Sequence, residues 1–371
     1  MLTAIFAAAV AIAATCDLEH PSGQPGCTRT AVDALPMTQI QVIGTHNSYK
    51  AAIAPAEMAL VKAIAPKTAE GLDYSKPSLT TQLNAGARQI ELDYVYDPEG
   101  GRYAHPLGLK MGKDEASAPY DNSQMMKPGM KVMHVPDIDY RSVCPTFVAC
   151  LTEIRTWSRA HPEHVPILII MNLKDDDIKV PGAVHLLPFD AKAMDAIDAE
   201  IRSVFPEKEL ITPDNVRGQH ATVREGAMAG GFPKLKAARG RFLFAMDENA
   251  AKAELYRGSR RSLEGRAMFV NIDEDSPMAG YITLNEPIEL SDRIAKAVKA
   301  GFIVRTRADA DTVEARGDDR KRQGVAFATG AQYVSTDYMT PDTRFSDYEA
   351  HLPGGGVARL NPVTGGQAAG K

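Results

Sequence analysis

The stretch RQIELDY, Arg88 to Tyr94, places two carboxylates two positions apart inside a short apolar run. Successive side chains of a β-strand point to opposite faces, so Glu91 and Asp93 would share one face of a predicted strand. On an exposed strand that face would simply be solvated. On a strand whose outer side is covered by helices, the two carboxylates would point inward, where burial is costly without a compensating cation. The fold around this stretch therefore decides what the carboxylates do.

Short apolar runs like this one recur along the chain, and amphipathic stretches with helical spacing separate them. The expected strands are Ile40 to Gly44, Arg88 to Tyr94, Lys131 to Val135, Val165 to Met171, Arg241 to Asp247, Ala267 to Ile272, Gly301 to Arg305 and Gln332 to Asp337. Strands that alternate with helices pair in parallel. These eight units predict an α/β protein with a distorted TIM-type (β/α)8 barrel, and a doubly wound open sheet is the main alternative.

The length of 371 residues and the 44% hydrophobic content allow one large core or two average domains. No low-complexity linker divides the chain, which favours a single domain. We expect an N-terminal extension at 16–37, the barrel at 38–350 and a C-terminal tail at 351–371. The net charge of −5 provides no global positive surface for nucleic acid, and no protein partner is implied.

Residues 1–15 form an apolar run that ends in small residues, which predicts a signal peptide and a secreted or periplasmic protein. The run is shorter than the roughly 20 residues that a spanning helix needs. Cysteines of an exported protein usually pair. Closeness in sequence predicts the disulfides Cys144–Cys150 and Cys16–Cys27, with buried free thiols as the alternative.

Polar side chains lie at the C-terminal ends of the expected strands, where barrel enzymes carry their chemistry. In chain order they are His46, Asn47, Glu91, Asp93, His134, Asn172, Lys174, Arg305, Arg307 and Asp337. A single histidine near a strand end is more often a hydrogen-bonded packing residue than a catalyst. The prediction of a site therefore depends on the whole set meeting at one end of the barrel.

Four members of the set carry side-chain oxygen atoms that suit calcium. They are Asn47, Glu91, Asp93 and Asn172. Zinc fits less well, because the set holds only two histidines and no cysteine lies near them in sequence. The residue types therefore predict a calcium site and leave His46 and His134 for proton transfer.

Two histidines beside a divalent cation are typical of a site that cleaves phosphodiesters. One histidine can take a proton from the nucleophile, and the other can protonate the leaving oxygen. The cation and basic side chains stabilise the charge that grows on the phosphate. The candidate residues for binding the substrate and its phosphate are Lys174, Arg305, Arg307 and Asp337.

Taken together, several stretches resemble the calcium-dependent phosphatidylinositol-specific phospholipases C of bacteria. They are GTHNSY, ARQIELDYVYD, the segment from GMKVMHVPDIDYRS to VPILII, ELITPDNVRG, MFVN, AGFIVRTRADADTVEARGDD and GAQYVSTDYMTPDTRF. The resemblance runs from about residue 38 to about residue 363. It implies a distorted TIM barrel, calcium, and a phospholipid substrate at a membrane surface. It also implies that the inositol 2-hydroxyl attacks the phosphate and that diacylglycerol is released.

The resemblance assigns roles residue by residue. The two catalytic histidines of the family fall on His46 and His134, and calcium ligands fall on Asn47, Glu91 and Asp93. The chain departs from the family pattern at Asn172, where NLKDD stands in place of a stretch like ELKDD. An amide oxygen can still bind calcium, but the site loses one negative charge.

Two other functions remain open from the sequence. A glycerophosphodiester phosphodiesterase or a sphingomyelinase D type lipase also resembles a barrel with two histidines and acidic metal ligands, and would release glycerol phosphate or a ceramide phosphate. A non-catalytic phosphoinositol-binding barrel would bind its ligand without turnover.

Overall fold

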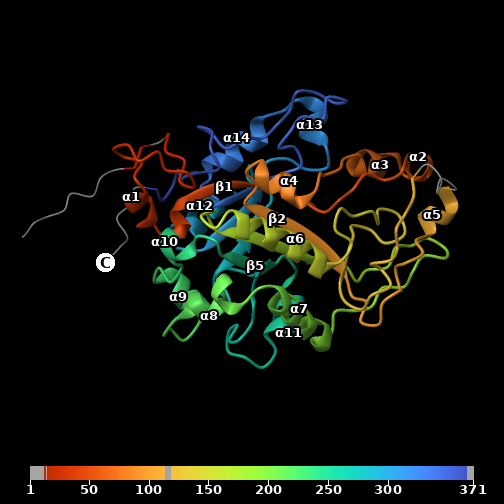
Figure 1. Ribbon diagram of the computed structural model, residues 1–371, viewed down its shortest axis with the longest axis horizontal. Coiled ribbons are helices and arrows are strands. Elements are labelled where there is room, and N and C mark those ends of the chain that lie inside the picture. Colours follow the sequence, from red (N-terminus) through yellow and green to blue (C-terminus); the bar gives the residue numbers. More distant parts are fainter. Residues whose placement is uncertain (1–11, 14, 113–117, 366–371) are drawn as a thin grey trace, which may run out of the picture.

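The computed structural model describes residues 12–13, 15–112 and 118–365, so the expected signal peptide at 1–15 lies almost wholly outside the described residues. Eight parallel strands form the centre of the molecule (Figure 1). They are β1 (Ile40–Thr45), β2 (Gln89–Val95), β4 (Ile167–Leu173), β5 (Phe242–Met246), β6 (Met268–Val270), β7 (Tyr281–Thr283), β8 (Ile303–Arg307) and β9 (Tyr333–Thr336). Two short antiparallel strands are added, β3 (Lys131–Val132) on β2 and β10 (Ala358–Leu360) on β1.

The strands form two five-stranded sheets, in the orders β10-β1-β9-β8-β7 and β3-β2-β4-β5-β6. The two sheets meet at two junctions, neither of which is a regular strand ladder. A parallel bridge between Asn271 and Tyr281 joins β6 to β7, and the Arg88 N–H donates to the Ile43 carbonyl, 2.9 Å away, between β1 and β2. The parallel strands therefore follow one another in chain order around a distorted barrel, which confirms the predicted fold class.

The junction between β1 and β2 is a close approach of two backbones without a regular ladder. A Cβ on Gly44 would lie 2.4 Å from the Cβ of Gln89, a distance that real side chains do not tolerate. The Gln89 side chain instead crosses the junction and donates to the Thr45 carbonyl at 3.1 Å. Glycine is required at this point because no side chain fits there.

One expected barrel strand is wrong, and one barrel strand was not expected. In the stretch Lys131 to Val135 only Lys131 and Val132 form a strand, and it runs antiparallel to β2 as an edge strand. The barrel position instead belongs to Tyr281–Thr283, which pairs in parallel with β8. Three residues are too few for a periodic pattern to distinguish a strand from a loop.

Helices cover the outer face of the barrel. They are α4 (Leu79–Asn84), α6 (Phe147–Ala160), α7 (Ala191–Val204), α8 (Pro213–Arg217), α9 (Val223–Met228), α10 (Leu235–Ala238), α11 (Ala250–Arg257), α12 (Ser291–Lys299), α13 (Val313–Gly317) and α14 (Lys321–Ala328). In α6 the Thr146 hydroxyl accepts the Ala149 N–H at the start of the helix, and the apolar stripe from Phe147 to Trp157 is buried. Short 3-10 turns lie at Met37–Gln39 and Glu207–Glu209.

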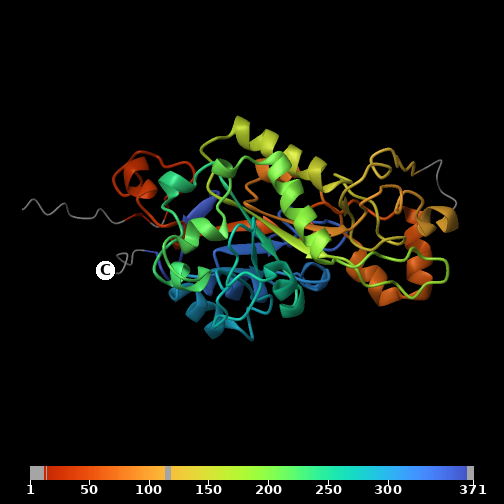
Figure 2. The same ribbon diagram turned by 90° about the horizontal axis from the view of Figure 1, so that it is seen from below.

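A side lobe extends from one end of the barrel in both views (Figures 1 and 2). It consists of α2 (Pro55–Ile64), α3 (Pro66–Leu72), α5 (Leu107–Gly112) and the loop around Val180. The N-terminal segment, with α1 (Arg29–Asp33), lies at the opposite end of the molecule. The described residues include no helix long and apolar enough to cross a membrane.

The N-terminal segment packs against the ends at which β2 and β4 begin. The buried carboxylate of Glu19 pairs with Arg88 and accepts the Val165 N–H at 2.9 Å. The Leu18 N–H donates to the carbonyl of Ala358, 2.8 Å away, in β10, within the expected C-terminal tail. Both ends of the described chain therefore meet at the N-terminal end of the barrel.

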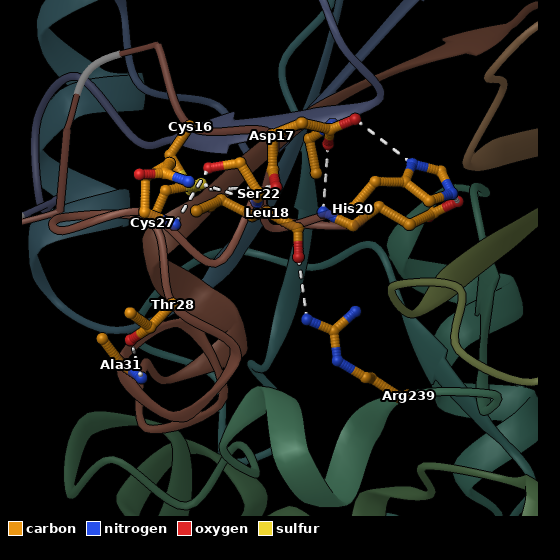
Figure 3. The surroundings of a disulfide bond; sticks show 12 residues. Cys16, Asp17, Leu18, His20, Ser22, Cys27, Thr28, Ala31 and Arg239 are labelled. Atoms are coloured by element: carbon orange, nitrogen blue, oxygen red, sulfur yellow. Dashed lines mark hydrogen bonds and ion pairs between the residues drawn. A yellow bond between two sulfur atoms is a disulfide. The ribbon is translucent and has the colours of Figure 1, made fainter.

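Both predicted disulfides are confirmed, and they include all four cysteines of the sequence. Cys16–Cys27 closes a loop within the N-terminal segment, shown in Figure 3. Cys144–Cys150 joins the first turns of α6 to the residues just before it. The alternative of buried free thiols is therefore wrong.

Candidate active site

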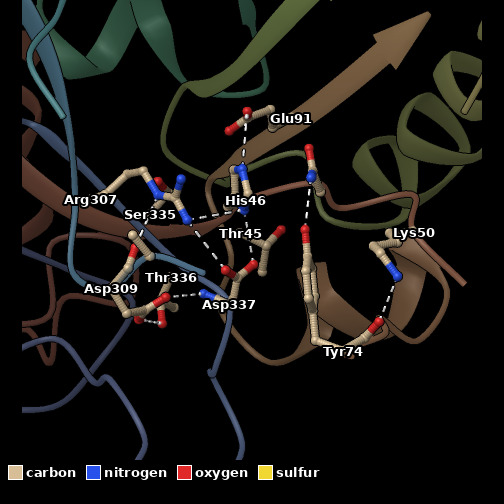
Figure 4. Close-up of polar contacts among 12 residues, drawn as sticks. Thr45, His46, Lys50, Tyr74, Glu91, Arg307, Asp309, Ser335, Thr336 and Asp337 are labelled. Carbon is tan, nitrogen blue, oxygen red and sulfur yellow. Dashed lines mark hydrogen bonds and ion pairs between the residues drawn. The ribbon is translucent and has the colours of Figure 1, made fainter. Parts of the chain in front are cut away.

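His46 lies just past β1 and contacts residues of three other strands, two at strand ends and one within β2 (Figure 4). Its Nδ1 is 3.0 Å from Oδ1 of Asp337, which follows β9, and its Nε2 is 3.8 Å from Oε1 of Glu91 in β2. Nη2 of Arg307, at the end of β8, is 3.3 Å from Nδ1 of His46 and 3.3 Å from Oδ2 of Asp337. The structure thus brings these four predicted residues together.

The charges around His46 set its protonation state. Burial, and after it the Arg307 guanidinium, lower the pKa of His46, while Asp337 and Glu91 act in the opposite direction. Burial alone would raise the pKa of Asp337, but Lys76, His46 and Arg307 hold it well below its usual range. A neutral imidazole beside an ionised carboxylate is suited to accepting a proton near neutral pH.

His134 has a similar arrangement just past β3. Its Nδ1 is 2.8 Å from Oδ2 of Asp139, and the other carboxylate oxygen is 3.3 Å from Nζ of the buried Lys50. In both histidines the carboxylate is at Nδ1, so a ring that donates from Nδ1 has its Nε2 available for another partner. The His134 side chain is 22% exposed and helps to line a pocket of ≈ 420 Å³ together with Lys174 and Lys252.

Glu91, Asp93 and Asn172 converge on the inner face of β2 and β4. The Asn172 Nδ2 donates to Glu91 Oε1 at 3.1 Å and to Asp93 Oδ1 at 3.1 Å. Each carboxylate also has a basic partner: Arg305 donates to Glu91 Oε2, and Nζ of Lys174 is 2.9 Å from Asp93 Oδ2. The inward orientation expected from the stretch Arg88 to Tyr94 is therefore correct.

Asp93 is close enough to both histidines to respond to their charge. Burial favours the neutral acid, but Lys174, and with it His134 and His46, hold the pKa of Asp93 below its ordinary value. The charges of His46, His134, Glu91 and Asp93 therefore influence one another.

The donor set fits a hard cation. One oxygen each from Glu91 and Asp93 points at a common position, where Asn172 places its amide nitrogen. A half-turn of that amide would replace the nitrogen by an oxygen, and a cation lying between the three oxygens would offset their mutual repulsion. Asn47, the fourth expected ligand, instead donates its Nδ2 to the Tyr74 hydroxyl at 2.7 Å. Calcium accepts such a mixture of carboxylate and amide oxygens and completes its coordination with water.

The set is nevertheless poor in acidic ligands. Across the described ranges, no group of three or more histidine, cysteine, aspartate or glutamate side chains is placed to hold a metal ion. The reason is that the side chain beside the Glu91 and Asp93 carboxylates is the Asn172 amide and not a third acid.

Several residues at the site were missed from the sequence. Lys76 donates to the Asp337 carbonyl at 2.6 Å, and Asp139 holds His134, but neither follows a strand. Asp247 directly follows β5, and its Oδ2 lies 3.9 Å from Arg305. Burial, only partly offset by Arg305, raises the pKa of Asp247 to about 6. Asp247 directly follows a strand, so the pattern that predicted the other residues applies to it as well.

The fold and this set of side chains define a class. A parallel α/β barrel joins two carboxylate-held histidines, oxygen donors for a hard cation and several basic side chains at the C-terminal ends of its strands. That combination defines a phosphodiesterase of the barrel type.

The chain belongs to the family described as phosphoinositide phospholipase C, Ca2+-dependent, whose model matches residues 35–362. The resemblance stated from the sequence is therefore confirmed, and the family is one of calcium-dependent enzymes. No curated protein matches the chain significantly.

Solved structures of similar proteins support the fold. A calcium-dependent phosphoinositol-specific phospholipase C from Pseudomonas sp., in a myo-inositol complex, is 16% identical, with a TM-score of 0.52 over 88% of this chain and 96% of that one. A calcium-dependent phosphatidylinositol-specific phospholipase C from Streptomyces antibioticus is 17% identical, with a TM-score of 0.50 over 82% and 95%. At such identities the likeness shows the fold alone.

Proposed function

We propose that the protein cleaves phosphatidylinositol by the phospholipase C reaction, in which the inositol 2-hydroxyl attacks the adjacent phosphate and diacylglycerol leaves. The observation that carries this proposal is the pair of histidines, each held at Nδ1 by a carboxylate. Cleavage of a phosphodiester needs one group to remove a proton and another to deliver one, and this pair provides both.

His46 is assigned the role of base. Its pKa is lowered by burial and by Arg307, so the ring is neutral and able to take the proton of the attacking hydroxyl. Asp337 holds Nδ1 and stabilises the imidazolium that results. We therefore assign Asp337 to positioning His46 and not to direct contact with the substrate, which refines its expected role.

His134 is assigned the role of acid. It is more exposed than His46 and lies at the pocket that also contains Lys174. A protonated His134 can deliver its proton to the departing diacylglycerol oxygen while Asp139 stabilises the positive charge. One proton passes from the inositol hydroxyl to His46, and one proton passes from His134 to the diacylglycerol oxygen. The reaction therefore takes up and releases equal numbers of protons.

The basic side chains divide into two groups by exposure. The Lys174 side chain is 33% exposed and can contact the substrate phosphate. Arg307 is 13% exposed and lies beside His46, where it can stabilise charge on a phosphate oxygen. The Arg305 side chain is 1% exposed and donates to Glu91, so we assign it to orienting that carboxylate.

Glu91, Asp93 and Asn172 would hold the calcium ion, and Asn47 would add its Oδ1 oxygen, because the bond to Tyr74 uses only its Nδ2. When bound, the ion supplies positive charge that lowers the pKa of the inositol hydroxyl and neutralises the phosphate.

A panel of phospholipids tests the proposal. The purified protein is incubated with phosphatidylinositol, phosphatidylcholine, sphingomyelin or glycerophosphodiesters, with calcium or with chelator, and the released head group is identified by mass. We expect an inositol phosphate, cyclic or linear, from phosphatidylinositol in calcium only. Glycerol phosphate or ceramide phosphate would support one of the other lipases, and binding without any product would support a non-catalytic barrel.

We also infer that the protein acts outside the cytoplasm. Two disulfides support this inference, because such bonds persist in oxidising compartments. Fractionation of a producing bacterium, with detection of the protein in periplasm or medium, tests it.

A further inference from the structure

A buried lysine joins the His134 pair to a short stretch of chain, residues 72–76, which we call the bridging segment. The Lys50 side chain is 0% exposed, and its Nζ lies 3.3 Å from Oδ1 of Asp139, whose other oxygen holds His134. The same ammonium donates to the carbonyl of Leu72 at 3.0 Å and to that of Tyr74 at 2.8 Å. Lys50 therefore fixes the carboxylate of one histidine and the backbone of the bridging segment at the same time.

The last residue of the bridging segment reaches the other histidine pair. Lys76 donates its backbone N–H to the Lys50 carbonyl at 2.8 Å. Its Nζ donates to Oδ1 of Asp337 at 3.0 Å and to the Asp337 carbonyl at 2.6 Å. Asp337 is the carboxylate that holds Nδ1 of His46. A continuous series of buried contacts thus joins the carboxylate of His134 to the carboxylate of His46.

Tyr74, in the middle of the bridging segment, packs against both lysines and lies beside His46 (Figure 4). The ammonium groups of Lys50 and Lys76 are 4.7 Å and 5.0 Å from the centre of its ring. The Tyr74 and His46 rings are stacked, with centroids 6.3 Å apart, and the Tyr74 hydroxyl accepts the Asn47 Nδ2 at 2.7 Å. Because an aromatic face attracts cations, the ring helps to hold both ammonium groups in place.

The bridging segment is also held by residues near the C-terminal end of the chain. The Thr312 hydroxyl donates to the Glu70 carbonyl, 3.0 Å away, just before the segment, and Nη1 of Arg344 is 2.8 Å from Oδ1 of Asp73 within it. Thr312 has a φ of 65°, a left-handed backbone conformation that β-branched residues rarely adopt. Such conformations persist only where surrounding contacts impose them, and they gather at functional sites.

We propose that Lys50 and Lys76 are positioning residues that hold the two histidine–carboxylate pairs in one fixed arrangement through the bridging segment. The inference rests on the proposed function, since it takes His46 as the base and His134 as the acid. Both imidazoles must be aligned on one phosphodiester at the same time, and a misplacement of about 1 Å can lower turnover roughly a hundredfold. The two lysine side chains are 0% and 3% exposed, so they act through the carboxylates and not on the substrate.

The kinetics of single and double variants test this coupling. With a water-soluble inositol phosphodiester, Lys50→Gln and Lys76→Gln should each lower kcat roughly tenfold to a hundredfold and change KM less than about twofold. The variant with both substitutions should lose no more than the worse single variant, because both substitutions release the same segment. A loss equal to the product of the two single losses would show that the lysines act separately and would overturn the proposal.

Arg88→Gln is the matched control. Arg88 is also buried, donates to the carbonyls of Leu83 and Ala87 and pairs with the buried Glu19, but it does so at the opposite end of the barrel. Like each lysine variant, it removes a buried cation beside a carboxylate, so it should lower the melting temperature. Its kcat should equal that of the wild type. Equal losses of kcat in the control and the lysine variants would mean that only stability was lost, against the proposal.

Imidazole NMR signals of the protein without substrate provide a test that needs no activity. In protein with isotope-labelled histidine, the signals of His46 and His134 are assigned from His46→Gln and His134→Gln. Lys76→Gln should move the signals of both histidines, although its Nζ binds the carboxylate of His46. Arg88→Gln should move neither.

Unmoved His134 signals in the folded Lys76→Gln protein would overturn the inference, whether or not Lys50→Gln folds. A wild type that cleaves no phosphatidylinositol would overturn the proposed function instead. In that case movement of both sets of signals would still show that the bridging segment couples the two histidine pairs.

Discussion

Each of the two histidines is held by one carboxylate, and the two carboxylates lie at very different distances along the chain. Asp139 is five residues from His134, whereas Asp337 is 291 residues from His46. Asp337 could be predicted because it directly follows an expected strand, and parallel strands finish at one end of a barrel. Asp139 and Lys76 could not be predicted, since they lie in loops, where the sequence carries no such signal and only the folded chain shows their contacts.

The histidine roles make a direct prediction. His46→Ala and His134→Ala should each lower turnover of phosphatidylinositol by roughly a hundredfold or more, the usual effect of losing a general acid or base. Their melting temperatures should stay close to that of the wild type, because neither side chain belongs to the apolar core. Loss of activity in proportion to a large drop in melting temperature would show that the histidines only pack.

Asn172 makes a second prediction. A third carboxylate would stand where the amide now donates to Glu91 and Asp93, so Asn172→Glu should lower the melting temperature in chelator and raise the stabilisation gained from calcium. The half-saturating calcium concentration for activity should fall, with turnover unchanged or reduced. Asn172→Gln, which keeps the charge, is the control. Equal calcium titrations for the Glu variant and the wild type would remove residue 172 from the metal site.

At the scale of elements, long periodic segments were predictable and short ones were not. The buried stripe of α6 follows its sequence spacing, and the apolar runs became β4 and β5. β7 has only three residues, and β3 pairs over two residues at an edge, so packing and not local pattern decides both. In Lys131 to Val135 the apolar side chains pack into two different clusters, Val132 in the main core and Met133 in a smaller one, although the segment is only an edge strand.

The contact between α7 and the turn before β3 contains a half-buried acid, Glu200, that should make stability depend on pH. Burial raises the pKa of Glu200 to about 7, although its Oε1 accepts the Met130 N–H at 2.9 Å. The folded protein thus binds a proton between about pH 4.5 and 7 that the unfolded chain does not, and stability falls as pH rises through that window.

Replacing the acid should therefore help most at high pH. Glu200→Gln should raise the melting temperature more at pH 8 than at pH 5, with a difference in unfolding free energy on the order of 2 kcal/mol. The control Glu99→Gln changes an exposed acid and should show little pH-dependent difference. Equal gains at both pH values would mean that Glu200 ionises normally in the folded protein.

At the scale of the whole molecule, the barrel has two different ends. The C-terminal ends of the strands carry the candidate site and the side lobe, and the other end is covered by the N-terminal segment with its Cys16–Cys27 disulfide. Fold class and the disulfides followed from the sequence, and so did most residues that the structure gathers in the candidate site. The covering role of the N-terminal segment did not, because the pairing of Glu19 with Arg88 joins residues far apart in the chain.

This separation of ends predicts that stability and activity can be changed independently. Cys16→Ser/Cys27→Ser should lower the free energy of unfolding by about 2–3 kcal/mol, because the unfolded chain gains the entropy of an open loop. Turnover at room temperature should be unchanged, since the bond lies at the end opposite the site. A matching fall in turnover of the folded variant would show that the two ends are coupled.

The hydrogen bond between Leu18 and Ala358 has a consequence for the order in which the chain is made. During synthesis or translocation residues emerge from the N-terminus onward, so β1 must wait without its neighbour β9 and without β10 until Leu360 is free. Nascent chains truncated before residue 358 should consequently remain sensitive to protease and bound by chaperones. A circular permutant that links the two ends and opens the chain in an exposed loop would shorten that wait, because its partner strands would emerge one after the other.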